Sequence, residues 1–357
     1  MAASGALRGQ GVADLGPLLA PLVAEHRVPA LGAAVLVDGK LAALGASGVR
    51  RAGHENPVTT DDLWHLGSCT KAMTATLLAT FVDQDALAWN ATVAATLPDL
   101  AEAMHADSKV ITVRQLLAHR AGLPGGPPAD LWARLWTWTE PLPAARTETA
   151  RTMLGVPPEK APGSRYLYSN AGYIVAGAIA ERLGKASFED LLRERVWRRL
   201  GITSGGFGAP GEKDATTQPW GHTAGKDGPV SHFHDNPPAH GPAGTVHMTL
   251  RDWAKYAAMH LGEPAADGKP LLAAATLRAL HTPAAREDYA FGWRVTSRPW
   301  ASGPILTHSG SNTMWYCVAW LAPEAKFAVL VTCNHGDGSA ACDAVAAACV
   351  QRFRPAK

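Results

Sequence analysis

The sequence has 357 residues, of which 47% are hydrophobic, and its 33 basic and 31 acidic residues leave a formal net charge of +2. This length suits two closely packed lobes or one large α/β unit, and the interleaved charges predict no nucleic-acid-binding face. No apolar stretch is long enough to span a bilayer, and residues 1–11 lack the charged-then-apolar order of a signal peptide. We therefore expect a cytoplasmic protein or, if an export signal has been removed, a periplasmic or secreted one.

The first fifty residues predict a helix followed by a β-hairpin. Residues 13–25 place five apolar side chains on one helical face, and the β-prone run 31–37 follows. The pair Asp38-Gly39 is a type I′ turn signal, so the chain from Leu41 onward should return as the second strand.

Helices dominate the predicted middle of the chain. The stretch from Ser68 to Gln84 contains no Gly or Pro and keeps apolar residues at helical spacing, which indicates a buried helix that Ser68 opens. Further helices, separated by Pro- and Gly-rich connections, are predicted at residues 112–118, 171–183 and 249–261.

Strand character resumes near the end of the chain, and it is followed by a last helix. The predicted strands are 292–295, 316–321 and 327–333, and the predicted helix is 339–353. Strands at both ends around a helical middle indicate a mixed α/β (α+β) fold. Residues 1–65 and 270–357 would then share one sheet, with residues 66–269 inserted as a mainly helical lobe.

The five cysteines have no regular spacing, and their number is odd. They are Cys69, Cys317, Cys333, Cys342 and Cys349. This pattern favours buried reduced thiols over a disulfide framework.

Three short patterns carry most of the chemical information: Ser68-Cys69-Thr70-Lys71, Tyr168-Ser169-Asn170 and His308-Ser309-Gly310. In the first, the i to i+3 spacing puts the Ser hydroxyl and the Lys amine on one face of a helix. A Ser hydroxyl is a weak nucleophile until a base takes its proton, and a Lys can serve if burial or a nearby cation lowers its pKa. The first pattern is therefore a candidate nucleophile and base.

The other two patterns offer supporting groups. Tyr168 can relay the proton and deliver it to the leaving group, and the Asn170 amide can bind a substrate carbonyl and orient Lys71. The third pattern should lie at a strand edge, where the N–H groups of Ser311 and Ser68 could form an oxyanion hole.

Together these patterns resemble those of the penicillin-recognising serine hydrolases, which include class C β-lactamases, D-alanyl-D-alanine carboxypeptidases and β-lactamase-like esterases. The Tyr-x-Asn form of the second pattern is similar to the class C and carboxypeptidase branch. The similar segments are Leu66–Lys71, Val113–His119, Gly122–Pro124, Pro162–Gly163, Tyr168–Tyr173, Pro242–Gly244 and His308–Gly310.

The resemblance implies a β-lactamase/transpeptidase-like fold, in which an antiparallel sheet flanked by helices adjoins a mostly helical lobe. The active site would lie in the cleft between them, with no cofactor. The implied activity is hydrolysis of ester or amide bonds of small molecules or peptides through an acyl-enzyme. The implied site residues are Ser68 as the acylated group, Lys71 and Tyr168 as proton carriers, Asn170 as a substrate contact, and His308, Ser309, Gly310 and Ser311 as the opposite wall.

Two further interpretations stay open: a D-Ala-D-Ala carboxypeptidase or β-lactamase proper, and a penicillin-binding sensor that does not turn over. The chain departs from the family pattern at His308, where β-lactamases usually carry Lys. It departs again at Met314-Trp315, where smaller residues are more common. Both departures argue against efficient β-lactam hydrolysis.

The candidate residues also have purely structural interpretations. Ser68 could cap a helix while Lys71 reaches solvent, and Tyr168, Asn170 and His308 could be a packed tyrosine, a turn residue and a satisfied polar residue. Three nearby tryptophans could roof the cleft or simply pack together: Trp132, Trp136 and Trp138.

Other site types are not favoured by the sequence. The run His232-Phe233-His234-Asp235 resembles part of a metallo-β-lactamase motif, but Asn236 stands where a carboxylate ligand is expected and the final His is absent. No metal site is therefore predicted. The chain also lacks the Gly-x-Ser-x-Gly of α/β-hydrolases and a phosphate-binding Gly loop.

Overall fold

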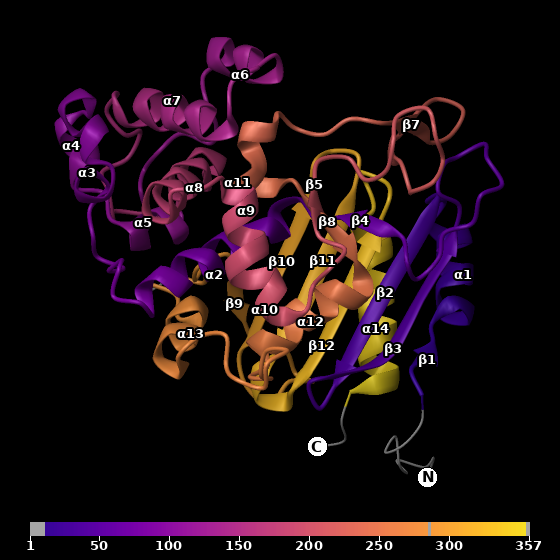
Figure 1. Ribbon diagram of the computed structural model, residues 1–357. Helices are drawn as coiled ribbons and strands as arrows, with labels where there is room; N and C mark the ends of the chain where they lie inside the picture. Colours follow the sequence, from indigo (N-terminus) through magenta and orange to yellow (C-terminus); the bar gives the residue numbers. More distant parts are fainter. Residues whose placement is uncertain (1–10, 285–286, 355–357) are drawn as a thin grey trace.

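The computed structural model describes residues 11–284 and 287–354, and a seven-stranded sheet forms one half of it (Figure 1). The strand order is β1-β3-β2-β12-β11-β10-β9, and every neighbouring pair is antiparallel except β1 with β3. Strands from both ends of the chain thus form one sheet, and the predicted antiparallel sheet is confirmed. The strands are β1 (Ala13–Asp14), β2 (Ala30–Val37), β3 (Lys40–Gly48), β9 (Arg294–Thr296), β10 (Ile305–Ser311), β11 (Tyr316–Ala322) and β12 (Phe327–Cys333).

Both faces of this sheet are covered, which explains the uninterrupted apolar sequence of β12. Val329 and Val331 pack into one hydrophobic cluster, whereas Ala328 and Leu330 pack into another. Successive side chains of a strand point to opposite faces, so a strand with two dry faces needs apolar residues throughout. Every residue of β12 is indeed buried.

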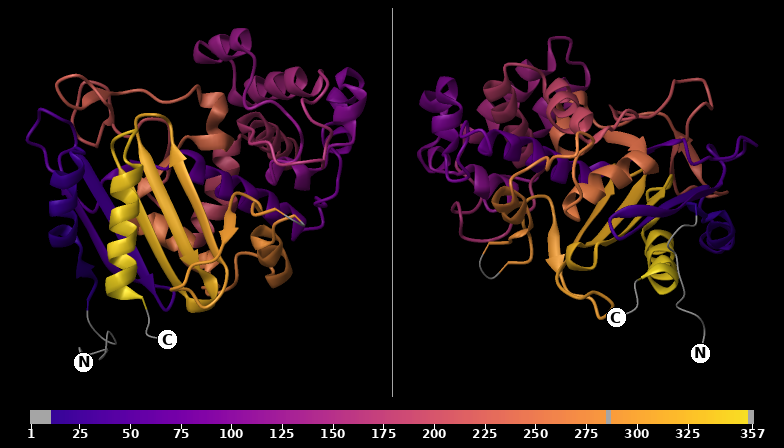
Figure 2. Two further views of the ribbon diagram at one scale, coloured as in Figure 1. Left: turned by 180° about the vertical axis from the view of Figure 1, so that it is seen from behind. Right: turned by 60° about the horizontal axis from the view of Figure 1, so that its bottom comes forward.

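Helices α1 (Gly16–His26) and α14 (Ser339–Phe353) cover one face of the sheet, and α12 (Leu250–His260) covers the other (Figure 2). The helix predicted at 13–25 begins only at Gly16, because Ala13 and Asp14 pair with β3 as the short strand β1. The helices predicted at 249–261 and 339–353 are confirmed as α12 and α14.

The remaining helices gather beside the sheet around α2 (Thr70–Val82), which is buried along almost its whole length. Helices α8 (Asn170–Gly184) and α11 (Gly241–Gly244) pack on α2, and α7 (Leu142–Leu154) packs on α8. A helix surrounded in this way needs small or apolar residues on every side. The shorter helical elements are η1 (Gly67–Cys69), α3 (Val93–Thr96), η2 (Pro98–Ala103), α4 (Ala106–Lys109), α5 (Val113–Leu117), α6 (Ala129–Trp136), α9 (Phe188–Leu192), η3 (Arg193–Trp197), α10 (Arg198–Leu200), η4 (Pro238–His240), α13 (Ala274–His281) and η5 (Pro323–Ala325).

Two small sheets accompany the large one. Their strands are β4 (Leu63–His65), β8 (Val246–Thr249) and β5 (Gly206–Phe207) in one, and β6 (Gly221–Thr223) and β7 (Val230–His232) in the other. The predicted division of the chain, with residues 66–269 as an inserted helical lobe, stays a prediction. Helix α12, which lies inside that range, packs on the large sheet.

Two local predictions are confirmed. Asp38 and Gly39 both have positive φ angles, 50° and 74°, and they form the two-residue turn between β2 and β3. All five cysteines are buried and carry free thiols.

Within the described residues, no helix has the length and apolar character needed to cross a membrane. The sequence predicts no signal peptide in residues 1–11. Residues 1–10 lie outside the described part of the chain, so this stays a prediction.

The end of β10 lies directly against the segment that leads into α2. A Cβ atom added to Gly310 would collide with the carbonyl oxygen of Leu66 and lie 2.9 Å from the nitrogen of Ser68. Gly67 approaches from the other side with a φ of +46°, and a Cβ there would collide with the nitrogen of Ser311. Two glycines therefore allow two backbones to touch without intervening side chains.

We expect Gly310→Ala to lower the free energy of unfolding by about 1–3 kcal/mol, because backbone atoms that the new methyl group meets cannot rotate away. Urea denaturation of the purified protein measures this loss. Gly126→Ala is the matched control, since nothing lies within 4 Å of its added Cβ. Equal stability of the two variants would contradict the close packing of β10 on this segment.

Candidate active site

Ser68 and Lys71 meet where η1 continues into α2. The Lys71 Nζ lies 3.0 Å from the Ser68 Oγ, 2.7 Å from the Asn170 Oδ1 and 2.6 Å from the carbonyl oxygen of Ala243. The sequence predicts Ser68 as the first residue of the helix, but the chain forms the 3₁₀ turn η1 here, and α2 begins at Thr70. The i to i+3 contact is kept because η1 and α2 are continuous.

Burial changes the acidity of Lys71. The residue has no exposed surface, and desolvation lowers the pKa of its amine to about 7 from an ordinary 10.5. A neutral amine has two N–H groups and one lone pair. The carbonyl oxygens of Asn170 and Ala243 can only accept hydrogen bonds, so they take the two N–H groups and leave the lone pair directed at Ser68. Lys71 is thus arranged as a base for the Ser68 hydroxyl.

Tyr168 contacts the same hydroxyl from the opposite side. Its OH donates to the Ser68 Oγ at 2.9 Å, and the Lys71 Nζ lies 4.9 Å from the centre of its ring. Burial raises the pKa of the Tyr168 phenol above its ordinary value, and the hydrogen bond with Ser68 opposes this only in part. Tyr168 therefore stays protonated at neutral pH, and it can donate a proton more readily than it can act as the first base.

The helix α8 positions both Tyr168 and Asn170. Ser169 caps this helix, since its Oγ accepts from the N–H of Gly172 at 3.0 Å, and its own N–H donates to the His119 Nδ1 at 3.1 Å. The His119 ring also lies 4.2 Å from the Tyr168 ring, centre to centre. His119 belongs to one of the segments that carry the family resemblance, and it supports the tyrosine.

A cavity of about 300 Å³ opens above these groups. The residues that line it are Ser68, Tyr168, His308, Ser309 and Ser311, together with Tyr166, Tyr289 and Arg294. No pattern in the sequence pointed to the last three. Arg294 lies on β9, opposite Thr307 of β10, so only strand pairing brings it to the cavity.

His308 is less free than the sequence suggests. Its Nδ1 lies 2.6 Å from the carbonyl oxygen of Ser309 and must donate to it, because a carbonyl cannot donate. Its Nε2 lies 2.9 Å from the Tyr289 OH and, in the neutral ring, accepts from it. Both ring nitrogens are therefore engaged, and a direct contact of His308 with substrate stays a prediction.

Ser68 and Ser311 carry the two backbone N–H groups that the sequence assigns to an oxyanion hole. Both residues line the cavity, and the Gly67 and Gly310 contacts described above place their backbones side by side. The assignment stays a prediction, which the shared cavity supports.

The bulky pair after the third pattern does not narrow the cavity. Met314 is 4% and Trp315 2% exposed, and Trp315 packs edge-on against Trp64 with ring centres 6.3 Å apart. These residues therefore give no steric argument against β-lactams.

The three tryptophans considered as a roof do not line the cavity. Trp132 and Trp138 pack in a small hydrophobic cluster with Leu131 and Leu135, and Trp136 is 46% exposed. The packing interpretation fits their positions better.

The His232–Asp235 run makes hydrogen bonds to other side chains of the protein. The His232 Nε2 lies 2.8 Å from the Thr223 Oγ1, and Asp235 is bound to His65 and Asn312. In residues 11–284 and 287–354 no group of three or more His, Cys, Asp or Glu side chains could hold a metal ion.

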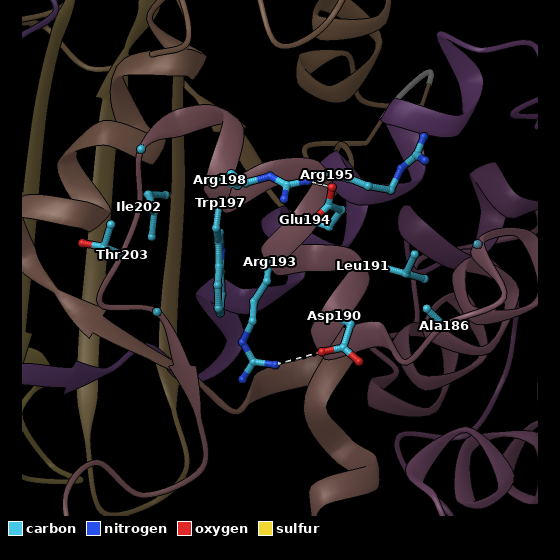
Figure 3. Close-up of a pocket in the computed structure, with 13 residues that line it drawn as sticks. Ala186, Asp190, Leu191, Arg193, Glu194, Arg195, Trp197, Arg198, Ile202 and Thr203 are labelled. Atoms are coloured by element: carbon cyan, nitrogen blue, oxygen red, sulfur yellow. Dashed lines mark hydrogen bonds and ion pairs between the residues drawn. The ribbon is translucent and has the colours of Figure 1, made fainter. Parts of the chain in front are cut away.

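A wider hollow of about 770 Å³ lies along η3 and the segment 201–205, away from the three patterns (Figure 3). Four of its charged side chains form two pairs, since Arg193 contacts Asp190 at 3.3 Å and Arg198 contacts Glu194, while Arg195 bonds to Thr80 and Gln84. None of its described lining residues belongs to the Ser68, Tyr168 or His308 patterns.

Comparison with known proteins shows the family of this chain. The β-lactamase family matches residues 16–351. The chain belongs to this family. The resemblance noted in the sequence is thus confirmed, and with it the class of enzyme: family members are serine hydrolases.

Individual relatives differ in what their names describe. Penicillin-binding protein 4 of Amycolatopsis lactamdurans is 30% identical over 87% of this chain and 82% of its own length. An unguisins hydrolase of Aspergillus campestris is 26% identical over 90% of this chain and 61% of its own length. Among solved structures, a class C β-lactamase superposes with a TM-score of 0.77 at 20% identity, covering 94% of both chains. A β-lactamase/D-alanine carboxypeptidase from Pseudomonas syringae superposes with a TM-score of 0.76 at 18% identity, covering 94% of this chain and 97% of its own.

The lowered pKa of Lys71 predicts how the reactivity of Ser68 depends on pH. Raising the pH through about 7 deprotonates Lys71, so the fraction of neutral base rises about tenfold between pH 6 and pH 8. The rate of Ser68 modification by a fluorophosphonate should rise by a similar factor and then level off. Stopped-time labelling followed by mass spectrometry measures it.

Lys71→Arg is the control for this experiment, because a guanidinium stays protonated over the whole range. Its labelling should be slow at every pH. A wild-type rate that does not change between pH 6 and pH 8 would show that Lys71 is not the base.

Proposed function

We propose that this enzyme cleaves an ester or amide bond of a small molecule or peptide through an acyl-enzyme on Ser68. The observation that supports this proposal is the single hydroxyl held between a buried amine and a half-buried phenol, with Lys71 at 3.0 Å and Tyr168 at 2.9 Å, at the base of a cavity. This is the arrangement of an activated nucleophile with a second proton carrier.

In the acylation step, the neutral Lys71 amine takes the Ser68 proton while the Ser68 Oγ bonds to the substrate carbonyl carbon. The carbonyl oxygen becomes an oxyanion, which the N–H groups of Ser68 and Ser311 stabilise. The bond to the leaving group then breaks. Tyr168 gives its phenolic proton to the leaving oxygen or nitrogen. The proton held by Lys71 then passes to Tyr168 and restores the phenol.

Deacylation runs through the same groups in reverse roles. A water molecule enters the place of the leaving group and loses a proton to the Tyr168 and Lys71 pair as its oxygen bonds to the acyl carbon. The Ser68 Oγ leaves and regains its proton from Lys71. The free acid is released, and the enzyme returns to its initial protonation state.

Arg294 supports a narrower choice of substrate, namely an acyl compound that carries a carboxylate. Its guanidinium lines the cavity with Ser68, and its side chain is 49% exposed even though it contacts Asp288 at 2.6 Å. Both ring nitrogens of His308 already have partners within the protein. Among the described lining residues, Arg294 is therefore the side chain that can offer a permanent positive charge to a substrate. A peptide C-terminus or another carboxylate is the group that a guanidinium recognises.

Replacing either central residue should abolish turnover. Ser68→Ala, Lys71→Ala and the double variant should all lose at least about 10³-fold in kcat/KM, to a similar level, because cooperating residues act as a unit. Hydrolysis of p-nitrophenyl butyrate measures this loss, and peptide mapping after fluorophosphonate labelling should find the adduct on Ser68.

Burst kinetics distinguish an enzyme with turnover from a sensor that is only acylated. A catalyst continues to release p-nitrophenol after the first equivalent, whereas a sensor stops there. The proposed mechanism would be contradicted if the double variant lost the product of the two single-variant losses in kcat/KM. Labelling at another serine would contradict it as well.

Arg294→Gln should lower kcat/KM for a carboxylate-bearing substrate by about three- to tenfold. The effect is modest because a half-exposed charge is screened by water, which limits its value to about 0.7–1.4 kcal/mol. The measurement compares the p-nitrophenyl monoester of adipic acid with p-nitrophenyl hexanoate, which lacks the carboxylate. An equal change with both esters would show that Arg294 does not select for charge.

A further inference from the structure

A buried hydrogen-bond network connects the residue before Ser68 with the residue after Ser311. The N–H of Gly67 donates to the His65 Nδ1 at 3.1 Å, and the His65 Nε2 lies 2.7 Å from the Asp235 Oδ2. The Asn312 Nδ2 donates to the other carboxylate oxygen of Asp235 at 2.9 Å. None of the three side chains is among the described residues that line the cavity.

The geometry determines the protonation of His65. Its Nδ1 accepts a backbone N–H and therefore carries no proton, so its Nε2 carries the proton and donates to Asp235. The His65 side chain has no exposed surface, and that of Asp235 is 4% exposed. Each hydrogen bond of this pair thus lies in a dry environment, where an unsatisfied partner is costly.

Asp235 is held as a carboxylate. Burial alone raises the pKa of its carboxyl, but the neighbouring His65 and the hydrogen bonds from His65, Asn312 and the N–H of Asn236 outweigh this and hold the pKa below its ordinary value. Its two oxygens accept from two different segments of the chain, β4 and the turn after β10. A single side chain therefore fixes the distance between these segments.

Asn312 connects the network to the backbone after Ser311. Its Oδ1 accepts from the N–H groups of Met314 and Trp315, at 3.2 Å and 3.1 Å, while its Nδ2 donates to Asp235. These bonds fix which end of the amide carries the oxygen, and the amide cannot flip without losing partners.

The network encloses the two backbone N–H groups of the oxyanion hole. Gly67 precedes Ser68, Asn312 follows Ser311, and between them the backbones touch at Gly67 and Gly310. Oxyanion donors must be held within a few tenths of an ångström to be effective, and removing one donor typically costs about 10²–10³ in kcat. A side-chain clamp on both flanks supplies that rigidity.

We infer that Asp235 is a positioning residue, which acts through His65 and Asn312 to hold the Ser68 and Ser311 N–H groups at the spacing required by the oxyanion. This role rests on the proposed function, because it has a purpose only if an oxyanion forms at Ser68. It also assigns a place to the His232–Asp235 run, whose acidic residue binds a histidine on β4.

The test exchanges the polarity of one hydrogen bond. In Asp235→Asn, one side-chain oxygen becomes an NH₂ group, so His65 and Asn312 cannot both be satisfied. Asn312→Asp places two carboxylates together and loses the same bond. In the double variant Asp235→Asn/Asn312→Asp, the amide introduced at position 235 accepts from His65 and donates to the carboxylate introduced at position 312. That carboxylate still accepts from Met314 and Trp315, and the net charge of the double variant equals that of the wild type.

Each single variant should lose about 10- to 100-fold in kcat for p-nitrophenyl butyrate, with KM changed by less than about threefold, since substrate binding does not depend on the oxyanion. The double variant should recover to within about threefold of wild type. The affinity for an alkylboronic acid, which forms a tetrahedral adduct on Ser68, should fall and recover in parallel with kcat.

Asp252→Asn is the matched control. Asp252 is also buried, at 3% exposure, and accepts from the N–H groups of Thr203 and Ser204, but it lies on α12 outside the cavity. This variant should lose thermal stability and keep its kcat. If a single exchange at 235 or 312 prevents folding, His65→Gln provides the same comparison, because it keeps a donor near the place of Nε2 and leaves the Gly67 N–H without its acceptor.

Three results would overturn the inference: full kcat in the single variants, a double variant as slow as the singles, or an equal loss of kcat in Asp252→Asn. Ser68→Ala, assayed in the same series, separates this outcome from failure of the proposed function. If Ser68→Ala keeps its activity, the proposed function is wrong. If Ser68→Ala is inactive while Asp235→Asn is fully active, only the positioning role is wrong.

Discussion

The burial of the Lys71 amine is the constraint on which the site depends. Helix α2 is enclosed by α8, α11 and α13, and its lysine has no exposed surface, so the amine must find its partners in the protein. Those partners come from three parts of the chain, Ser68, Asn170 and Ala243. The same desolvation that makes the charged amine costly lowers its pKa into the range where it can accept a proton. The packing that buries Lys71 is consequently also what makes its amine a base near neutral pH.

The large sheet contributes the other half of the site through its backbone. β10 reaches the nucleophile segment so closely that glycine is required on both sides of the contact, at Gly67 and Gly310. The buried bonds among His65, Asp235 and Asn312 lie just beyond this contact. If the N–H groups of Ser68 and Ser311 form the proposed oxyanion hole, their placement relies on these rigid elements and satisfied polar groups.

The cavity wall carries the residues that we propose select the substrate. Proteins named as a penicillin-binding protein and an unguisins hydrolase both align with this chain over most of its length. The shared fold supports the serine chemistry, and under our proposal the choice of substrate depends on wall residues such as Arg294, Tyr166 and Tyr289. In this chain, the cation at the wall is on β9, while the histidine of the third pattern is bound to Tyr289 and to its own neighbour's carbonyl.

Short-range patterns in the sequence determined the elements and the reacting groups. The i to i+3 spacing of Ser68 and Lys71, the turn at Asp38-Gly39 and the apolar run of β12 all depend on neighbours along the chain, so they could be read directly. Tertiary structure alone decided four other features. They are the start of α1, the position of Arg294 in the cavity, the burial of Trp315 and the bond between His65 and Asp235. Each of them joins residues whose separation in sequence carries no periodic signal, and only strand pairing and close packing bring such residues together.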